Sequence, residues 1–284
     1  MSYEFTEQDV DAASKKIIND LLAEGRFSPV SEPKLYLLGG QPGSGKSTIS
    51  NRLMNEYPNT VFINPDTYRE FHPQYAKIKA ELKSEAVQET GKFSGDVTER
   101  VRQMLSDQKY NLIIEGTFRT LETPQRITEE LNAKGYTAEL HAIAVPRDIS
   151  YVGTLHRYFI GKEIGTGRAV DKEHHDLAAD KLPANLKALA ESGMFQSMHL
   201  HTREKEVFST ERDADAFMKQ FHREAGRRLD LIQAKRLEKN IDFVNQSLTN
   251  EEKNGVTTIA KTPITEIRKE LQSIQKSRNI GMER

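Results

Sequence analysis

A glycine-rich segment, Leu35–Ser50 with the sequence LYLLGGQPGSGKSTIS, constrains this chain more than any other stretch. Gly40, Gly45, Lys46 and Ser47 match the spacing G-x-x-x-x-G-K-[ST] without a gap. In such a segment the glycines let successive backbone N–H groups point at phosphate oxygens. The lysine reaches the β- and γ-phosphates, and the hydroxyl that follows it holds Mg²⁺. The spacing therefore predicts a phosphate-binding loop for a nucleotide.

The residues on either side of the loop fit the strand and helix that such a loop requires. Leu35–Leu38 is a short apolar run typical of a buried strand, and Thr48–Glu56 has apolar residues at helical spacing. The positive end of the helix dipole would lie at the phosphates. These flanks argue against a chance glycine-rich turn. The residues expected to contact the nucleotide are Gly40, Gln41, Pro42, Gly43, Ser44, Gly45, Lys46, Ser47 and Thr48.

The composition of the 284 residues favours a globular core with long charged helices around it. Apolar residues make up 36% and charged residues 29%, and the mean hydropathy is −0.67. A net charge of −1 gives no general attraction to nucleic acid or to an anionic membrane. The absence of cysteine excludes disulfides and thiolate chemistry. Without a signal-peptide pattern or an apolar run of membrane length, we expect a soluble cytoplasmic protein.

Strand and helix patterns alternate along the first half of the chain. Strands are predicted at Leu35–Leu38, Thr60–Ile63, Tyr110–Ile114 and Glu139–Val145. Helices are predicted at about 7–24, 48–56, 74–108 (with a break marked by Gly91 and Gly95) and 124–134. Such alternation indicates βαβ units. The predicted fold class is a three-layer α/β, P-loop kinase-like fold with a mostly parallel sheet and a C-terminal helical appendage.

Acidic residues follow two of the predicted strands, at the edge where ligands gather in an open α/β sheet. Asp66 could accept a proton from a substrate hydroxyl that attacks the γ-phosphate, or it could cap the helix that follows, or do both. Glu115 ends an apolar strand, as the Walker B carboxylate does where it meets the metal shell or the substrate. The sequence thus places two candidate carboxylates beside the phosphate loop.

Two arginines and two histidines follow in the second half of the chain. Arg157 lies in a helical stretch, and Arg168 follows the glycine-rich segment Gly161–Gly167. Phosphoryl transfer needs cations over the γ-phosphate, so these arginines could belong to a lid, although solvated surface arginines are the alternative. His174 and His175 are adjacent and point in different directions on a helix. We interpret them as capping or structural residues rather than metal ligands.

Together these motifs resemble the zeta toxins of bacterial toxin–antitoxin modules, over roughly residues 5–225. The motifs are GGQPGSGKST (39–48), NPDTYREFHP (64–73), LIIEGTFRT (112–120), the spaced Arg157 and Arg168, and KEHHD (172–176). The resemblance implies a P-loop kinase that uses ATP and Mg²⁺. It also implies the 3′-hydroxyl of the amino sugar of UDP-N-acetylglucosamine as the acceptor, so that the product no longer serves cell-wall synthesis.

The resemblance also implies roles for single residues. Lys46 would bind the ATP phosphates, and Ser47, where the family more often has Thr, would hold Mg²⁺. Asp66 would be the general base, and Arg157 and Arg168 would contact the transferred phosphoryl group. The residues that would hold the sugar nucleotide are Glu99, Glu115, Thr117 and Arg119, of which Glu99 has surroundings that match poorly.

The resemblance fades beyond about Gly226, which divides the chain into a kinase domain (1–225) and an extension (226–284). Apolar residues at helical spacing in Leu237–Leu248 and Ile264–Ile274 predict a helical hairpin, with a turn at Asn250–Gly255. The extension could complete the kinase core, or bind a second copy or a partner. It could also inhibit in cis, because zeta toxins are silenced by a separate antitoxin whose helix blocks the ATP site.

Two other functions fit the same motifs. A kinase of the same build could act on another small hydroxyl compound, such as a nucleotide, a dinucleotide or an antibiotic. A nucleotide-binding regulator without phosphotransfer would need neither a base at Asp66 nor the spaced arginines.

Overall fold

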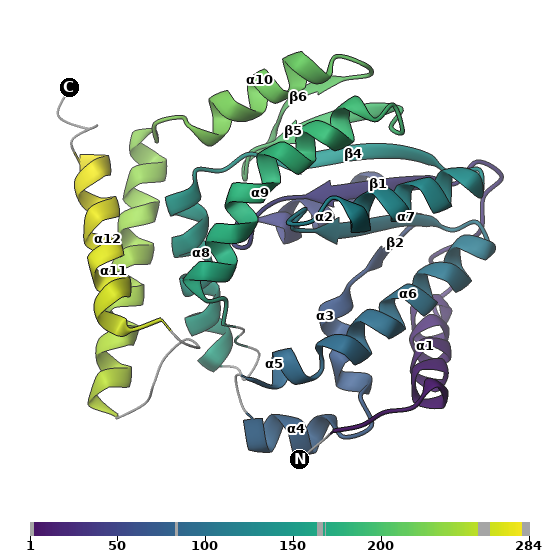
Figure 1. Cartoon of the computed structure of the whole chain (residues 1–284), viewed down its shortest axis with the longest axis horizontal. Coiled ribbons are helices and arrows are strands. Elements are labelled where there is room, and N and C mark those ends of the chain that lie inside the picture. Colours follow the sequence, from purple (N-terminus) through teal and green to yellow (C-terminus); the bar gives the residue numbers. More distant parts are fainter. Residues whose placement is uncertain (1–2, 83–84, 164–166, 168, 255–261, 280–284) are drawn as a thin grey trace.

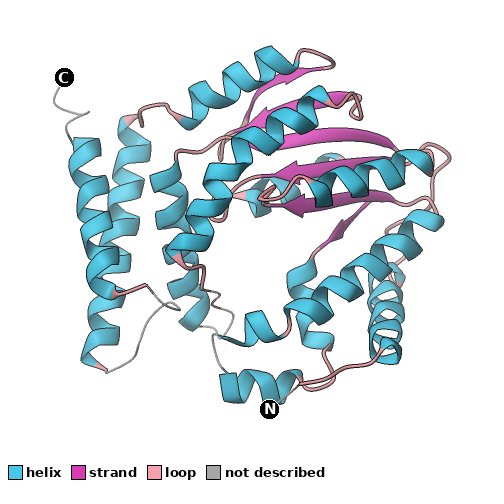
Figure 2. Ribbon diagram, viewed as in Figure 1, coloured by secondary structure: helices cyan, strands magenta, loops and turns pink. Residues whose placement is uncertain are grey.

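A six-stranded sheet lies at the centre of the computed structural model, which describes residues 3–82, 85–163, 167, 169–254 and 262–279 (Figures 1 and 2). Within these residues the strand order is β2-β3-β1-β4-β5-β6, and β6 alone runs antiparallel to its neighbour. The strands are β1 (Lys34–Gly39), β2 (Thr60–Ile63), β3 (Asn111–Gly116), β4 (Thr137–Ile143), β5 (Ser197–His201) and β6 (Glu206–Thr210). The four strands predicted from the sequence are confirmed as parallel neighbours in one sheet.

One face of the sheet is covered by helices from both halves of the chain. Alternate strand residues such as Leu35 and Leu37 point to this face and pack in one apolar cluster with Val101, Leu131 and Leu186. The helices that contribute to the cluster are α1 (Glu7–Leu22), which packs on α6 (Gly91–Asp107), α7 (Glu122–Ala133), α9 (Lys172–Glu191) and α10 (Ala214–Ala225).

The opposite face carries the phosphate-loop helix and the C-terminal hairpin. Tyr36 and Leu38 point to this side and share a second apolar cluster with Ile49, Ile241 and Leu271. Its helices are α2 (Lys46–Glu56), α8 (Arg147–Glu163), α11 (Leu231–Lys253) and α12 (Ile264–Asn279). In Figure 1, α11 lies along α8 and α12 lies along α11. The two helical layers with the sheet between them confirm the three-layer fold.

The predicted amphipathic hairpin is present, but its first helix is longer than expected. The apolar stripe of α11 and α12 is buried: Leu237, Ile241, Val244, Leu248, Ile267, Leu271 and Ile274. Helix α11 continues through Asn250 to Lys253, so the turn begins later than the sequence indicates. Glu251 explains the difference, because its buried carboxylate pairs with Lys162 of α8 and keeps the last turn of α11 against the core.

The segment between β2 and β3 is helical, as predicted, but is divided differently. It contains α3 (Pro65–Tyr68), a 3-10 turn η1 (Arg69–Phe71), α4 (Tyr75–Leu82), α5 (Ala86–Glu89) and α6. The predicted break at Gly95 is wrong, because Gly95 lies inside α6, which begins at Gly91. A Cβ at Gly95 would meet open space, so packing does not require glycine here. A glycine inside a helix lowers helix stability by only about 1 kcal/mol relative to alanine, which does not break the helix.

No sequence pattern described above predicts β5 and β6, which extend the sheet beyond β4, or α10, which follows them. These elements place the β5–β6 turn beside the phosphate loop, as shown below. None of the helices among the described residues is long and apolar enough to cross a membrane.

Candidate active site

The segment between β1 and α2 forms a tight loop that only glycine permits at two positions. Gly43 and Gly45 have φ of 73° and 103°, in the left-handed region that side chains disfavour. A Cβ at Gly43 would lie 2.1 Å from the carbonyl oxygen of Ser150 on α8. The N–H of Gly40 donates to the carbonyl of Gly116 at 3.2 Å, which joins the loop to the end of β3. The loop is therefore held by both neighbouring elements.

Polar groups of the loop are arranged for an anion and a hard cation. The Lys46 Nζ donates to the carbonyl oxygens of Gly40 and Gln41, at 2.6 and 3.2 Å, within its own loop. The buried hydroxyl of Ser44 has no hydrogen-bond partner. Ser47 is exposed in the first turn of α2, where its hydroxyl suits the oxygen shell of Mg²⁺. These residues fit nucleotide phosphates with Mg²⁺.

Three charged residues predicted from separate motifs act on Lys46 at this edge of the sheet. Burial lowers the pKa of the Lys46 ammonium to about 8. The negative charges of Glu115 and Asp66 oppose that shift, and the positive charge of Arg157, an exposed residue of α8, adds to it. The structure thus brings together Lys46, Asp66, Glu115 and Arg157, as the motifs predict. Arg168 lies outside the described residues.

Asp66 lies in the first turn of α3, and it does not cap that helix. The cap is Asn64, whose side-chain oxygen accepts from the N–H of Asp66 at 3.2 Å. The capping role considered for Asp66 is therefore wrong, because the side chain of Asn64 already accepts a backbone N–H at the start of the helix. The Asp66 carboxylate is about one third exposed and lies 3.5 Å from Nε of Arg69.

Glu115 lies next to the phosphate loop because β3 pairs directly with β1. Its strand register places it beside Leu38, one residue before Gly39 and the loop. The Ser50 hydroxyl on α2 lies 3.1 Å from the Oε2 of Glu115. The carboxylate therefore faces the helix that follows the loop.

An open pocket of about 240 Å³ lies beyond the end of β3, beside the start of α7. Glu115, Thr117 and Arg119, three of the four residues predicted to hold a sugar nucleotide, line it. The Nη1 of Arg119 is 3.2 Å from Nδ1 of His174 on α9. The pocket is open to solvent, and its carboxylate, hydroxyl and guanidinium groups could contact a polar ligand.

The fourth predicted residue, Glu99, does not line this pocket. It lies on α6 in an ion cluster, where it pairs with Arg102 and with Arg126, the latter at 3.5 Å. Glu130 joins the same two arginines, and Arg102 is buried. In this structure the Glu99 carboxylate therefore ties α6 to α7.

Phe118, which the sequence analysis does not single out, sets the conformation of the pocket-lining segment. It has φ of 50° and is buried against Gly39, where a Cβ would lie 2.0 Å from the ring. Asn185 of α9 donates through Nδ2 to the Phe118 carbonyl at 2.9 Å. A left-handed phenylalanine costs of order 1–3 kcal/mol, so the surrounding contacts must hold it. It orients Thr117 and Arg119 on either side.

A buried chain of hydrogen bonds holds the other side of the loop. The Gln41 Nε2 donates to the Ser150 hydroxyl at 2.7 Å, and that hydroxyl is 2.9 Å from His175 Nε2. The His175 Nδ1 is 3.0 Å from Asp176. The order Ser–His–Asp resembles a hydrolytic triad, but Ser150 is fully buried and occupied by Gln41. The histidine is structural, as predicted.

Arg203, in the β5–β6 turn, is a second residue that the sequence analysis misses. Its guanidinium donates to the carbonyl oxygens of Gly43, Ser44 and Ile149, at 2.5, 3.2 and 3.3 Å. It also lines a small pocket of about 50 Å³ that includes Gln233 and other residues of α11. Because Arg203 contacts both the loop and this pocket, the C-terminal hairpin lies one side chain away from the phosphate loop.

Comparisons with known proteins agree with this arrangement. The family model described as "Zeta toxin" matches residues 19–214. A Toxin zeta from Enterococcus hirae is 37% identical over 186 residues, which cover 64% of this chain and 65% of that protein. A Toxin zeta from Streptococcus pyogenes is 35% identical over 203 residues, which cover 70% of this chain and 70% of that protein. The Toxin PezT of Streptococcus pneumoniae is 36% identical over 65% of this chain and 74% of its own length.

Solved structures give the same result for the fold. A chain from the PezAT chromosomal toxin–antitoxin system of Streptococcus pneumoniae aligns with a TM-score of 0.76 at 26% identity, over 87% of this chain and 98% of that one. The AvrRxo1-ORF1:-ORF2 structure with ATP shares the fold at a TM-score of 0.52 and 16% identity, over 87% and 83%. From the matching family model and these relatives, the chain belongs to the zeta toxin family.

Proposed function

We propose that this chain transfers the γ-phosphoryl group of ATP to the 3′-hydroxyl of the amino sugar of UDP-N-acetylglucosamine in the cytoplasm. One observation carries the proposal. The charges of Asp66, Glu115 and Arg157 all act on Lys46, at the edge of the sheet where the phosphate loop begins. Nucleotide binding alone needs the loop and its lysine; a carboxylate base and an added cation are what phosphoryl transfer requires.

In the proposed reaction the acceptor oxygen forms a bond to the γ-phosphorus while the bond to the β–γ bridging oxygen breaks. The proton of the acceptor hydroxyl passes to the carboxylate of Asp66, and ADP leaves. Asn64 caps α3, so the Asp66 side chain is not used for that purpose. A base held on a helical turn at a strand end is positioned without a costly loop rearrangement.

Cations around the γ-phosphate offset the charge that develops during transfer. Lys46 and Arg157 are proposed for this role, with Arg168 added by family resemblance. The Ser47 hydroxyl would hold Mg²⁺, which would supply positive charge against the charge of the phosphates. The Ser44 hydroxyl in this loop is fully buried and has no hydrogen-bond partner.

The acceptor is proposed to occupy the pocket at the end of β3. Thr117 and Glu115 offer a hydroxyl and a carboxylate to sugar hydroxyls, and Arg119 suits the diphosphate. Glu99 joins this set by family resemblance, and it would have to leave its arginine partners to contact the sugar. The same pocket accommodates other small hydroxyl compounds, so the acceptor is the point to test.

The kinase domain is proposed to span 1–225, and the extension 226–284 to complete its core. The apolar cluster shared by Tyr36, Ile49, Ile241 and Leu271 supports this role. Inhibition in cis is a second proposal, since α11 lines the pocket beside Arg203 and the loop. The solved PezAT chain comes from a toxin–antitoxin system, and we propose an antitoxin partner for this chain as well.

The decisive experiment incubates the purified chain with ATP, Mg²⁺ and a panel of acceptors, and identifies products by mass spectrometry. The panel contains UDP-N-acetylglucosamine, nucleotides, dinucleotides and antibiotics. We expect one added phosphoryl group on UDP-N-acetylglucosamine. If only another acceptor is phosphorylated, that compound replaces UDP-N-acetylglucosamine as the proposed substrate. No turnover with any acceptor would favour a nucleotide-binding regulator.

Asp66→Asn tests the base, with Asp20→Asn on the exposed side of α1 as the matched control. Asp66→Asn should bind ATP normally and lose most of its phosphotransfer, while the control keeps both. Full activity of Asp66→Asn would refute the assignment. Removing residues 226–284 tests cis inhibition: a truncated chain that stays folded but is no more active contradicts it.

A further inference from the structure

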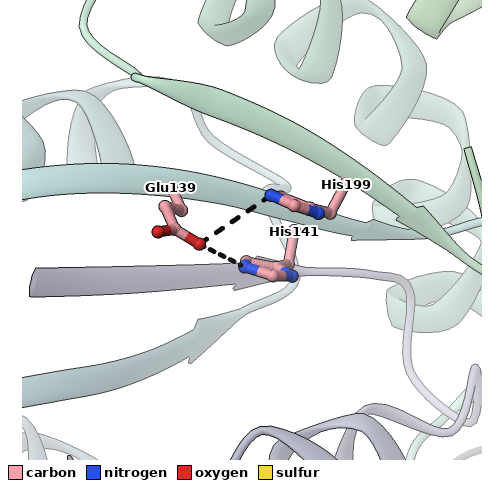
Figure 3. Close-up of side chains that lie close together, drawn as sticks. All are labelled: Glu139, His141 and His199. Carbon is pink, nitrogen blue, oxygen red and sulfur yellow. Dashed lines mark ion pairs between the residues drawn. The ribbon is translucent and has the colours of Figure 1, made fainter. Parts of the chain in front are cut away.

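Three potential metal ligands converge on the sheet, apart from the residues assigned above. Glu139 and His141 lie two residues apart on β4, so their side chains share one face. His199 lies directly opposite His141 on the parallel neighbour β5. Figure 3 shows the carboxylate of Glu139 pointing toward both imidazole rings. None of these residues lines the acceptor pocket or the phosphate loop.

The facing atoms lie at distances that one ion could bridge. The Glu139 Oε2 is 3.6 Å from His141 Nε2 and 3.8 Å from His199 Nε2 (Figure 3). All three ligand atoms lie within 4.8 Å of one another. These separations are too long for hydrogen bonds. Ligands about 2.0–2.1 Å from a tetrahedral ion lie roughly 3.4 Å apart, so small side-chain movements would close the set.

The atoms that face away from this point all have partners of their own. Glu139 Oε1 accepts from Lys34 Nζ at 2.9 Å. His141 Nδ1 is 3.0 Å from His201 Nε2, and His199 Nδ1 is 3.3 Å from Glu206 Oε1. Such outer contacts fix the tautomer and the orientation of metal-binding imidazoles. They leave Glu139 Oε2 and His141 Nε2 for a common ligand, whereas His199 Nε2 also contacts the Ser197 hydroxyl at 2.9 Å.

His141 has a buried ring nitrogen that the protein itself does not pair. The residue is 2% exposed, and its Nε2 has no hydrogen-bond partner. A buried nitrogen without a partner loses free energy that an ion would restore.

We propose that Glu139, His141 and His199 form a zinc site that links β4 to β5. Two imidazoles and one carboxylate are a donor set that zinc takes, and a water molecule would fill the fourth position. Imidazole nitrogens disfavour Mg²⁺, so the ion that the kinase reaction uses does not compete for this site.

Two local rearrangements accompany binding. The rings of His141 and His199 are stacked, with centroids 4.6 Å apart and 9° between their planes. One ring must turn about χ2, a soft torsion, before both lone pairs meet at one ion. The Ser197 hydroxyl, 2.9 Å from His199 Nε2, must give up that contact.

The test uses the untagged full-length chain, stripped of metal and titrated with ZnCl₂ in millimolar Mg²⁺. We expect one zinc per chain and a higher melting temperature with zinc. His199→Asn removes a partly exposed ligand. Losing a residue that only supports a ligand weakens metal affinity roughly 10- to 100-fold, so the loss of a ligand itself should weaken zinc binding by more than that. Glu206→Gln, which keeps all three ligands, should weaken it by roughly 10-fold or more.

His222→Asn, an exposed histidine of α10, is the matched control and should bind zinc like the unaltered chain. Circular dichroism shows whether each variant is folded. Co²⁺ in place of zinc should give the visible absorption of a tetrahedral site, which His199→Asn loses. Failure of the unaltered chain to bind zinc, or equal binding by folded His199→Asn, would overturn the proposal.

Discussion

The side chain of Asn185 donates a hydrogen bond to the carbonyl oxygen of Phe118 at 2.9 Å, across 67 residues of sequence. Phe118 has a left-handed backbone, with φ of 50°, and its ring fills the space above Gly39. One contact from α9 therefore holds the turn that presents Thr117 and Arg119 to the acceptor pocket. On the proposed function, we therefore expect Asn185 to position the acceptor and not ATP.

Asn185→Ala should raise the KM for the acceptor about 5- to 10-fold, because losing one hydrogen bond of about 1 kcal/mol loosens the Phe118 turn. The KM for ATP should stay the same. Steady-state kinetics with each substrate varied separately measures the split. Asn132→Ala is the matched control, because it removes a bond of the same type and length, to Met194 O at 2.9 Å, elsewhere. Equal increases for both substrates would contradict the positioning role.

Lys46 should make ATP affinity depend on pH in the alkaline range. Its pKa is lowered to about 8 in the nucleotide-free protein, and bound phosphates must raise it again. Above pH 8 ATP therefore binds with proton uptake, and its affinity should fall up to about tenfold per pH unit. Below pH 7.5 the lysine is already charged and this dependence vanishes.

Titration calorimetry between pH 7.5 and 9.5, in two buffers with different ionisation enthalpies, measures both the affinity and the proton uptake. Lys46→Arg is the control, since a guanidinium keeps its proton throughout this range. Its affinity can be lower, but its pH slope should be flat. The same slope in both proteins would show that another group titrates.

Local sequence patterns predict the parts of the site that depend on a few consecutive residues. The spacing of Gly40, Gly45 and Lys46 predicts the geometry of the loop. The apolar runs before Asp66 and Glu115 place those two acids at strand ends. Parallel pairing then brings the strand ends together. This is why the motifs and the central strands could be predicted without any knowledge of long-range contacts.

Contacts between distant segments explain what the sequence does not reveal. Arg203 contacts Ser44 from 159 residues away, and no motif surrounds it. Phe118 has a conformation that its residue type disfavours, so only tertiary packing selects it. Helix α11 ends later than the local sequence predicts for the same reason. The ion pair between Glu251 and Lys162 outweighs the local turn signal. The Glu139–His141–His199 cluster likewise forms only when β5 joins the sheet.

Arg203→Ala should weaken ATP binding about 10-fold or more, because three backbone carbonyls of the loop and α8 lose their donor. The KM for the acceptor should change little. Arg203→Lys should recover only part of the affinity, since an ammonium lacks the fork that reaches several carbonyls. Arg212→Ala, an exposed arginine after β6, serves as the control and should leave binding unchanged. An intact ATP affinity in Arg203→Ala would show that the loop holds its shape without it.

Leu271→Ala in α12 should lower the free energy of unfolding of the whole chain. Its side chain is fully buried in the cluster that contains Tyr36 of the central strand, and truncating a buried leucine costs about 2–5 kcal/mol. Ile232→Ala in α11 is the control, because Ile232 is 72% exposed and should change stability by less than about 0.5 kcal/mol.

Denaturant unfolding, followed by circular dichroism and by the loss of nucleotide binding, separates the two roles of the extension. If the hairpin completes the kinase core, both signals shift together to lower denaturant in Leu271→Ala. A hairpin that folds as a separate unit would instead unfold in an earlier transition of its own, with nucleotide binding unaffected. That outcome would place α11 and α12 outside the cooperative core and favour a regulatory or partner-binding role.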